Sequence, residues 1–95
     1  MNGPLHGVRV LDLTSIVLGP TATAALAELG ADVIKVEDPG AGDQIRNWRK
    51  MLDGTSLWWY VQSRNKKSVT VNLRTPEGQE IVRRLAADAD ILVEN

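Results

Sequence analysis

The sequence predicts an α/β domain with a parallel β-sheet, and two observations lead to this prediction. Short segments rich in branched apolar residues alternate with segments of helical periodicity, in the order strand, helix, strand, and this order occurs twice. The first unit, residues 7–37, has the length of a right-handed βαβ unit. Such alternation is typical of parallel α/β sheets, which bind ligands at the carboxyl ends of their strands. Function is therefore expected first at residues 14–19 and 37–40.

The first unit consists of a predicted strand over 8–13, a helix, and a second predicted strand over 32–37. We expect the helix to open at Gly19-Pro20 and to end before Gly30, because Pro favours the first helical position and Gly the position after the last. One face of this helix is expected to be buried, because apolar residues recur on it at helical spacing. These residues are Ala22, Ala25, Leu26 and Leu29.

The second unit follows an irregular segment, residues 44–63, that holds every aromatic residue and has no clean periodicity. A basic turn is expected over 64–68, a third strand over 68–73 and a fourth over 90–95. Between these strands, Thr75 is the expected helix cap, followed by Pro76 and Glu77. The predicted apolar face of that helix contains Ile81, Val82, Leu85 and Ala89. Two helices cover a four-stranded parallel sheet incompletely, so we expect further residues or a partner to complete the fold.

Composition places the chain among soluble globular proteins of at most one domain, with 43% hydrophobic and 24% charged residues. A net charge of −1 argues against a nucleic-acid or membrane role for the whole chain. The sequence contains no Cys, no secretory leader and no apolar run of membrane-spanning length, which favours a cytoplasmic protein. Its single histidine, His6, precedes the first strand and is expected at the surface, so no metal site is predicted.

Basic residues concentrate between Gln44 and Thr75, which contain seven of the 11 cationic residues and one of the 12 acids. A local positive surface of this kind suits a polyanionic ligand such as a nucleotide with several phosphates, or an acidic substrate. The alternative is a solvated face whose cations pair with acids elsewhere in the chain.

The dinucleotide fingerprint needs three glycines after the first strand, whereas residues 14–20 contain only Gly19. Asp12 and Asp32 are interpreted as hydrogen-bonding residues at strand and loop junctions, and Glu37 as a carboxylate that caps a loop. The aromatic residues could stack on a base or line a pocket, but packing is the more common role. From the residues alone, the chain is an α/β module with affinity for a phosphorylated small molecule and no complete catalytic group.

Several segments resemble the N-terminal part of the class III CoA-transferases, the family of formyl-CoA:oxalate and carnitine CoA-transferases and of alpha-methylacyl-CoA racemase. The segments occur in the right order at the right spacing and extend from Leu5 almost to the end of the chain. They are Gly7–Thr14, Gly19-Pro20, Leu29–Glu37, Pro39–Asp43, Arg64–Ser68, Pro76–Gly78 and Asp88–Asn95.

The resemblance implies that residues 1–95 are the N-terminal part of a Rossmann-like large domain that binds coenzyme A, in an interlocked homodimer. It implies transfer of CoA from an acyl-CoA to a carboxylic acid through an aspartyl thioester, without a metal. The nucleophilic Asp of the transferases lies downstream, so this chain contains no catalytic residue and is expected to be inactive alone. Two alternatives stay open: an acyl-CoA racemase with a downstream His/Asp pair, and a non-catalytic fragment or module that needs a partner chain.

The resemblance also implies which residues contact CoA. Val17 and Leu18 match the loop beside the thiol end, where oxalate-type members carry Gln and Ser, so an apolar pair indicates a larger or less polar acyl group. Val71, Asn72, Leu73 and Arg74 match the segment that meets the adenosine portion, with Arg74 on a phosphate. Asn95 matches an Asn that touches CoA. Position 38, often Arg in the family, is Asp38 here and is given no such role.

Overall fold

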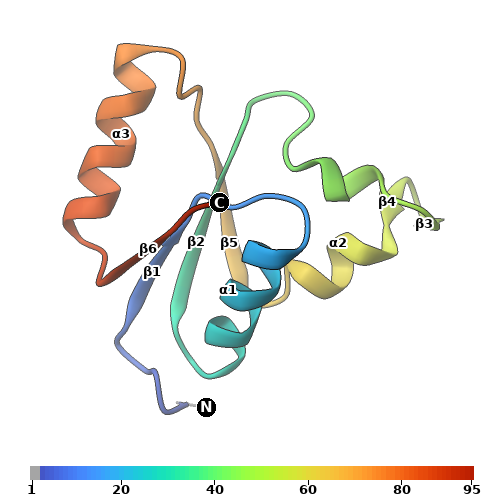
Figure 1. Cartoon of the computed structure of the whole chain (residues 1–95), viewed down its shortest axis with the longest axis horizontal. Helices are drawn as coiled ribbons and strands as arrows, with labels where there is room; N and C mark the ends of the chain where they lie inside the picture. The colour runs from blue at the N-terminus through green and yellow to red at the C-terminus, as the bar shows by residue number, and fades with distance from the viewer. Residues whose placement is uncertain (1–2) are drawn as a thin grey trace.

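A four-stranded parallel sheet forms the centre of the molecule, in the strand order β5-β2-β1-β6 (Figure 1). The computed structural model describes residues 3–95. The sheet strands are β1 (Arg9–Asp12), β2 (Asp32–Glu37), β5 (Lys66–Thr70) and β6 (Ile91–Val93). The helices are α1 (Leu18–Glu28), α2 (Leu57–Gln62), α3 (Pro76–Ala87) and the short 3₁₀ helix η1 (Gln44–Asn47). An antiparallel pair, β3 (Met51–Leu52) with β4 (Thr55–Ser56), completes the fold. The predicted α/β class and parallel sheet are confirmed.

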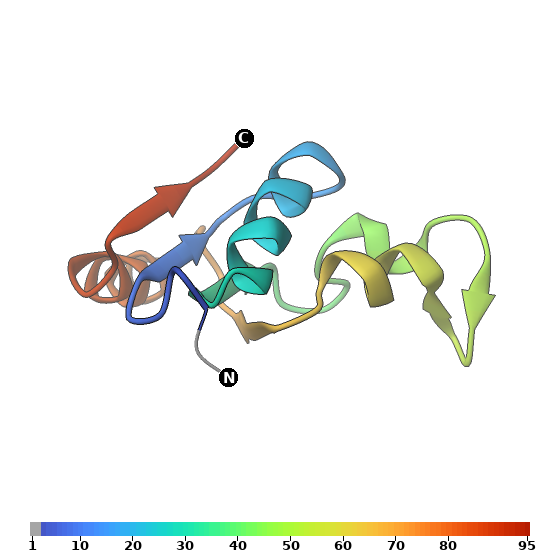
Figure 2. The same ribbon diagram turned by 90° about the horizontal axis from the view of Figure 1, so that it is seen from below.

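The two long helices cover opposite faces of this sheet, because successive residues of a strand point to opposite sides. Val10 and Val33 pack against Ala27 of α1 on one face. Leu11 and Val36 pack with Val82 and other residues of α3 on the other. Figure 2 shows the helices on the two sides of the strands. Each face of the sheet thus has one helix and a small core of its own.

The buried face of α1 differs from the predicted one. The helix begins at Leu18, so Pro20 is its third residue and not its first, and its buried residues are Gly19, Pro20, Thr23 and Ala27. Ala22, Ala25 and Leu29 are exposed, and of the predicted face only Leu26 packs on the core. The reason is close approach: a Cβ added at Gly19 would lie 2.3 Å from the Cβ of Thr14, so the helix meets the sheet through its smallest residues.

The second unit begins two residues earlier than predicted. Lys66 and Lys67 belong to β5, which pairs with β2 from Val33–Lys66 to Glu37–Thr70, and not to a turn. The Lys66 side chain is buried and pairs with Asp12, and the exposed Lys67 pairs with Asp32, so each lysine of β5 has an acidic partner. The start of α3 is confirmed, because the Thr75 side chain accepts a hydrogen bond from the Gly78 N–H. Val82, Leu85 and Ala89 pack on the core as predicted, whereas Ile81 is exposed.

The aromatic segment forms a projection that contains η1, β3, β4 and α2 and extends to one side of the sheet (Figures 1 and 2). Trp48 and Trp58 meet edge to face with their ring centroids 6.2 Å apart. Met51 and Leu52 form β3 and are exposed. No helix within residues 3–95 combines the length and the apolar character that a membrane crossing requires.

Candidate functional site at the carboxyl edge of the sheet

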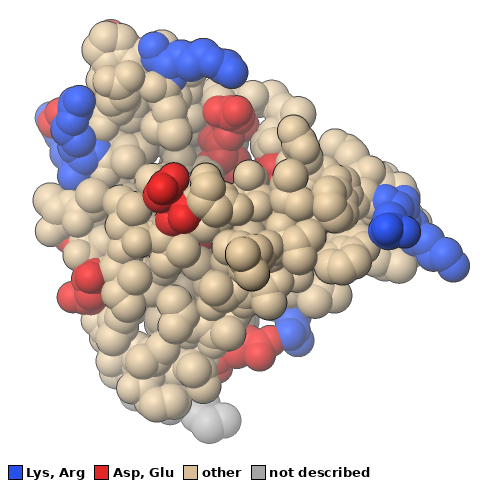
Figure 3. All heavy atoms as spheres, in the orientation of Figure 1, with Lys and Arg blue, Asp and Glu red and all other residues tan. Residues whose placement is uncertain are grey.

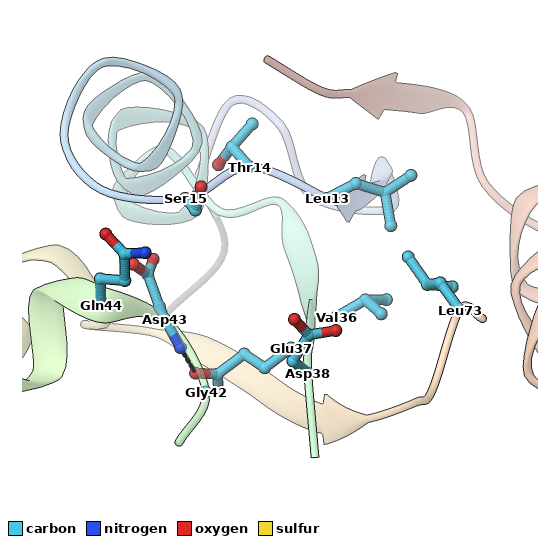
Figure 4. A pocket seen from close by; sticks show the side chains of 10 residues that line it. All are labelled: Leu13, Thr14, Ser15, Val36, Glu37, Asp38, Gly42, Asp43, Gln44 and Leu73. Atoms are coloured by element: carbon cyan, nitrogen blue, oxygen red, sulfur yellow. Dashed lines mark hydrogen bonds between the residues drawn. The ribbon is translucent and has the colours of Figure 1, made fainter. Parts of the chain in front are cut away.

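The strand order places a topological switch point beside β1. From β1 the chain crosses to β2 and then to β5 on one side, and later returns to place β6 on the other side of β1. Parallel sheets bind ligands at the carboxyl ends of the strands near such a point. A cavity of about 250 Å³ lies at this edge (Figure 4). Its lining residues are Leu13, Thr14, Ser15, Val36, Glu37, Asp38, Gly42, Asp43, Gln44 and Leu73. Both segments in which the sequence placed function contribute to this cavity.

The loop between β1 and α1 has three successive backbone N–H groups, and each donates to a different side chain. The Thr14 N–H donates to Asp12 at 2.9 Å, the Ser15 N–H to Asn95 at 3.2 Å and the Ile16 N–H to Asp43 at 3.0 Å. In a dinucleotide-binding loop, groups at this place bind a phosphate. Here the chain's own oxygen atoms occupy them, which agrees with the missing glycine fingerprint.

Asp12 anchors the start of this loop from the end of β1. Its carboxylate accepts hydrogen bonds from the Thr14 hydroxyl at 2.5 Å and the Thr23 hydroxyl at 2.7 Å, and pairs with Lys66 at 3.1 Å. Burial acts to raise the pKa of Asp12, but the bonds from Thr14 and Thr23 and the charge of Lys66 outweigh it and lower that pKa. Burial also lowers the pKa of Lys66, although Asp12 opposes this change. Asp12 thus has the structural role that the sequence predicted.

Glu37, at the end of β2, ties three segments together. Its carboxylate accepts hydrogen bonds from the Asp43 N–H at 2.9 Å, from Arg46 at 2.8 Å through two nitrogens, and from the Ser68 hydroxyl. The Arg46 guanidinium also lies over the Trp59 ring, 3.6 Å from its centroid. Burial acts to raise the pKa of Glu37, but the bonds from Arg46, Ser68 and Asp43 lower it to about 2. The predicted loop-capping role is confirmed, and it anchors the projection to β2.

Because the pKa of Glu37 is lower in the folded state than in the unfolded chain, Glu37 stabilises the fold fully above its ordinary pKa of 4.5. We expect this contribution to be lost as the pH falls from about 5 towards 2. Chemical denaturation across this range should show a steeper loss of stability for wild type than for Glu37→Gln. Identical slopes in the two proteins would contradict the assignment. Asp38→Asn, at the exposed neighbour, is the control and should keep the wild-type slope.

A buried ion pair joins Lys35 of β2 to Asp43 in the cavity lining, and it was not predicted from the sequence. The Lys35 ammonium is 2.9 Å from Asp43 Oδ2, and both side chains are 1% exposed. Lys35 also donates to the Thr14 carbonyl at 3.0 Å. A signal for the pair was present in the sequence, since a lysine inside an otherwise apolar buried strand needs an acidic partner.

The predicted CoA-contacting residues lie in three places around this edge. Leu73 lines the cavity, and Asn72 and Arg74 are exposed beside it. Val71 is buried in the core under α3. Val17 and Leu18 follow the β1–α1 loop without lining the cavity, and Leu18 is 82% exposed. The Asn95 side chain is bonded in both directions to the Ser15 backbone, at 3.2 and 3.1 Å.

The basic segment is largely neutralised by acids of the same chain. Ion pairs join Arg46 to Glu37, Arg64 to Glu28, Lys66 to Asp12 and Lys67 to Asp32. Figure 3 shows basic side chains in separate groups, over α3 and over the tip of the projection, on the face that it draws. For these four residues the structure therefore agrees with the alternative interpretation, in which the basic residues pair with acids elsewhere in the chain. Arg74 forms no ion pair with any residue of the range 3–95.

His6 is exposed, as predicted. Within the part of the chain that the structure describes, no group of three or more His, Cys, Asp or Glu side chains is arranged to hold a metal ion. At this edge the described residues offer hydrogen-bonding groups, carboxylates, apolar contacts and the exposed guanidinium of Arg74.

Together, the strand order and the edge cavity define an α/β protein with a parallel sheet and a candidate ligand site at the carboxyl edge of its strands. A sequence profile of CoA-transferase family III matches residues 5–95. The chain belongs to this family, and the resemblance noted in the sequence is confirmed.

Several curated relatives are similar over nearly the whole chain. The succinyl-CoA–D-citramalate CoA-transferase of Chloroflexus aurantiacus is 53% identical over 97% of this chain and 23% of its own length. The human succinyl-CoA:glutarate CoA-transferase is 52% identical over 97% of this chain and 21% of its own. The formyl-CoA:oxalate CoA-transferase of Escherichia coli is 46% identical over 100% of this chain and 23% of its own. The chain thus spans less than a quarter of the length of these relatives.

Two solved structures superpose closely on the chain. A CAIB/BAIF family protein from Brucella suis has a TM-score of 0.91 at 43% identity, covering 100% of this chain and 26% of that one. A protein from Mycobacterium tuberculosis has a TM-score of 0.84 at 44% identity, covering 95% of this chain and 24% of that one. The fold described above is therefore that of an N-terminal segment of this family.

Proposed function

We propose that the full-length protein transfers coenzyme A from an acyl-CoA to a carboxylic acid, and that residues 1–95 supply part of its CoA-binding site. The observation that carries this proposal is the family match over residues 5–95, with relatives at about half identity that are named CoA-transferases. The fold supports it, because the cavity lies at the edge where parallel sheets bind nucleotides. The reaction proceeds through an aspartyl thioester whose Asp lies outside these 95 residues.

In this proposal the turn after β5 receives the nucleotide end of CoA. Asn72 Oδ1 accepts the Arg74 N–H at 3.0 Å, which fixes the turn. Leu73 lines the cavity, so its side chain offers an apolar contact for the adenosine portion. The exposed Arg74 guanidinium is free to form a charge-assisted hydrogen bond with a phosphate. Val71, which is buried, supports the turn from the core beneath it.

The start of α1 is proposed to face the acyl group. Val17 and Leu18 are apolar and directly follow the fixed loop, so they favour an acyl chain with apolar surface. The Asn95 side chain is engaged with Ser15, and in the proposal it acts on CoA through the position of this loop.

Isotope exchange tests the proposed reaction. The full-length protein is incubated with an acyl-CoA and a labelled carboxylic acid, and the label should appear in the acyl-CoA pool. Exchange of the α-proton of the acyl-CoA without transfer of CoA would contradict the proposal and identify a racemase. A protein that does neither, and acts as a binding module, would show no label movement in either assay.

Arg74→Ala in the full-length protein is expected to raise KM for acyl-CoA by about tenfold, because one charge-assisted hydrogen bond to phosphate is lost. The turnover number should change much less, since Arg74 is assigned to the nucleotide end. The matched control is Arg84→Ala, which removes an exposed arginine that pairs with Glu80 of the same helix. Steady-state kinetics with both variants measure KM for acyl-CoA and the turnover number. An unchanged KM in Arg74→Ala would show that Arg74 does not contact CoA.

A further inference from the structure

We propose that Asp43 is a positioning residue for acyl recognition, because its carboxylate holds Ile16 in a left-handed conformation and thereby sets the position of Val17 and Leu18. This inference deepens the proposed function and rests on it. It concerns the buried Asp43 carboxylate, which belongs to the lining of the edge cavity.

The backbone at Ile16 is strained. Its φ is +73°, in the left-handed region that β-branched residues avoid. Arg49, Asp53 and Asn65 also have positive φ values, but among these non-glycine residues within the described range only Ile16 is β-branched. Such a conformation persists only where surrounding contacts impose it. At Ile16 the visible contact is the N–H, which donates to both oxygens of Asp43 at 3.0 and 3.2 Å.

The Asp43 carboxylate is itself held from several sides. It accepts the Ile45 N–H at 3.0 Å, which caps η1, and it pairs with Lys35 of β2 at 2.9 Å. The same lysine donates to the Thr14 carbonyl at 3.0 Å, on the far side of the loop. The Asp43 N–H is bound by Glu37 at 2.9 Å. The carboxylate is thus a fixed point that connects the β1–α1 loop to the end of β2.

The position of Leu18 depends on this fixed point. Leu18 is 82% exposed, so packing against the rest of the described chain contributes little to its placement. Its backbone is placed between two constraints: the buried residues Gly19 and Pro20 of α1 that follow it, and the backbone angles of the preceding loop, in which Ile16 is the strained residue. If Ile16 relaxed to a negative φ, the chain at Val17 and Leu18 would take another direction. A specificity surface made of these two side chains therefore needs the Asp43 contact.

A double-mutant cycle between positions 43 and 16 tests the inference in the full-length protein. Asp43→Asn leaves one acceptor oxygen in place of two and removes the charge. Ile16→Gly removes the strain, because glycine adopts a positive φ without steric cost. Two quantities are measured: amide hydrogen exchange in peptides that cover the loop, and the ratio of kcat/KM values for two acyl-CoA donors of different chain length. Asp38→Asn is the matched control, since it removes an acid from the same cavity without touching Ile16.

In the isoleucine background, Asp43→Asn should speed exchange of the loop by about tenfold and change the donor ratio by a similar factor. In the Ile16→Gly background, the effect of Asp43→Asn on the donor ratio should fall to about threefold or less. Glycine adopts the left-handed conformation without the Asp43 contact, so the loop backbone keeps its conformation. The Asp38→Asn control should leave loop exchange as in wild type. If Asp43→Asn alone does not fold, the cycle is repeated with Lys35→Met, which removes the cation that lost its partner.

If Asp43→Asn changed the donor ratio equally in both backgrounds, the inference would be overturned. Asp43 would then stabilise the fold independently of the strain at Ile16. Unchanged loop exchange would also overturn the inference. A wild-type protein that transfers no CoA would contradict the proposed function instead, and the exchange data would still decide whether Asp43 holds the loop.

Discussion

Asp12→Ala is expected to lower the free energy of unfolding by about 3–5 kcal/mol, the cost of breaking a buried ion pair by removing one partner. The Lys66 ammonium, whose side chain is 2% exposed, would lose its counter-ion, since its other hydrogen bond goes to the Pro20 carbonyl. The Thr14 hydroxyl would lose this acceptor as well, and the Thr23 hydroxyl would keep the longer hydrogen bonds to the Gly19 and Pro20 carbonyls, at 3.2 Å each. Because an ordinary domain is stable by about 5–15 kcal/mol, a loss of this size removes a large part of it.

Asp32→Ala is the matched control for this experiment. Asp32 also pairs with two cations, Arg9 and Lys67, but all three side chains are partly exposed to solvent. Exposed pairs contribute about 0–1 kcal/mol, so chemical denaturation should separate the two variants clearly. Combining Asp12→Leu with Lys66→Met should recover stability relative to Asp12→Ala, because no buried charge remains unpaired. If the two variants lost similar amounts of unfolding free energy, burial of the Asp12–Lys66 pair would not be the reason for its contribution.

Gly78→Ala is expected to destabilise the protein although the substitution lies in a helix. Alanine is favoured over glycine in helices by about 1 kcal/mol. A Cβ at position 78, however, would lie 1.9 Å from the carbonyl oxygen of Asn72, which is backbone and cannot rotate away. Such overpacking costs about 1–3 kcal/mol, so the steric cost should exceed the helical gain.

The same substitution should also affect function, because the segment that must move carries Leu73 and Arg74. We expect a higher KM for acyl-CoA together with a lower melting temperature. Glu77→Ala, at the exposed neighbouring position of α3, is the control and should change both quantities only slightly. A Gly78→Ala protein that is more stable than wild type would contradict this prediction. The turn after β5 could then shift at little energetic cost, and α3 would not set its position.

Features of the fold that depend on neighbours in sequence were predictable. The strands β1 and β2 and the cap at Thr75 follow from local residue preferences, and the structure has them where expected. The buried face of α1 was not predictable in this way. Alanines occur on all sides of that helix, so apolar spacing does not single out a face, and contact between Gly19 and Thr14 decides it. The pairing of Lys66 with Val33 likewise depends on the register of β5 against a distant strand.

The site was predictable as a place but not as a set of contacts. The rule for parallel sheets located function at the ends of the first two strands, and the cavity lies there. The strand order that creates the switch point, and the pairing of Lys35 with Asp43, depend on tertiary structure. The left-handed conformation of Ile16 runs against local preference, and local reasoning therefore fails at the residue to which we assign a role.

The two neighbours of the central strand β1 become available at very different times during synthesis. β2 follows after one short crossover, whereas the contact of β1 with the β6 segment joins Arg9 to Asp90, 81 positions apart. Chains are made from the N-terminus, and contacts between distant residues form slowly because a long loop must close first. Until the last of these residues is in place, Ser15 lacks the Asn95 side chain that holds it. Of the three side chains that accept the backbone N–H groups of this loop, Asn95 is therefore the last to be made, after Asp12 and Asp43.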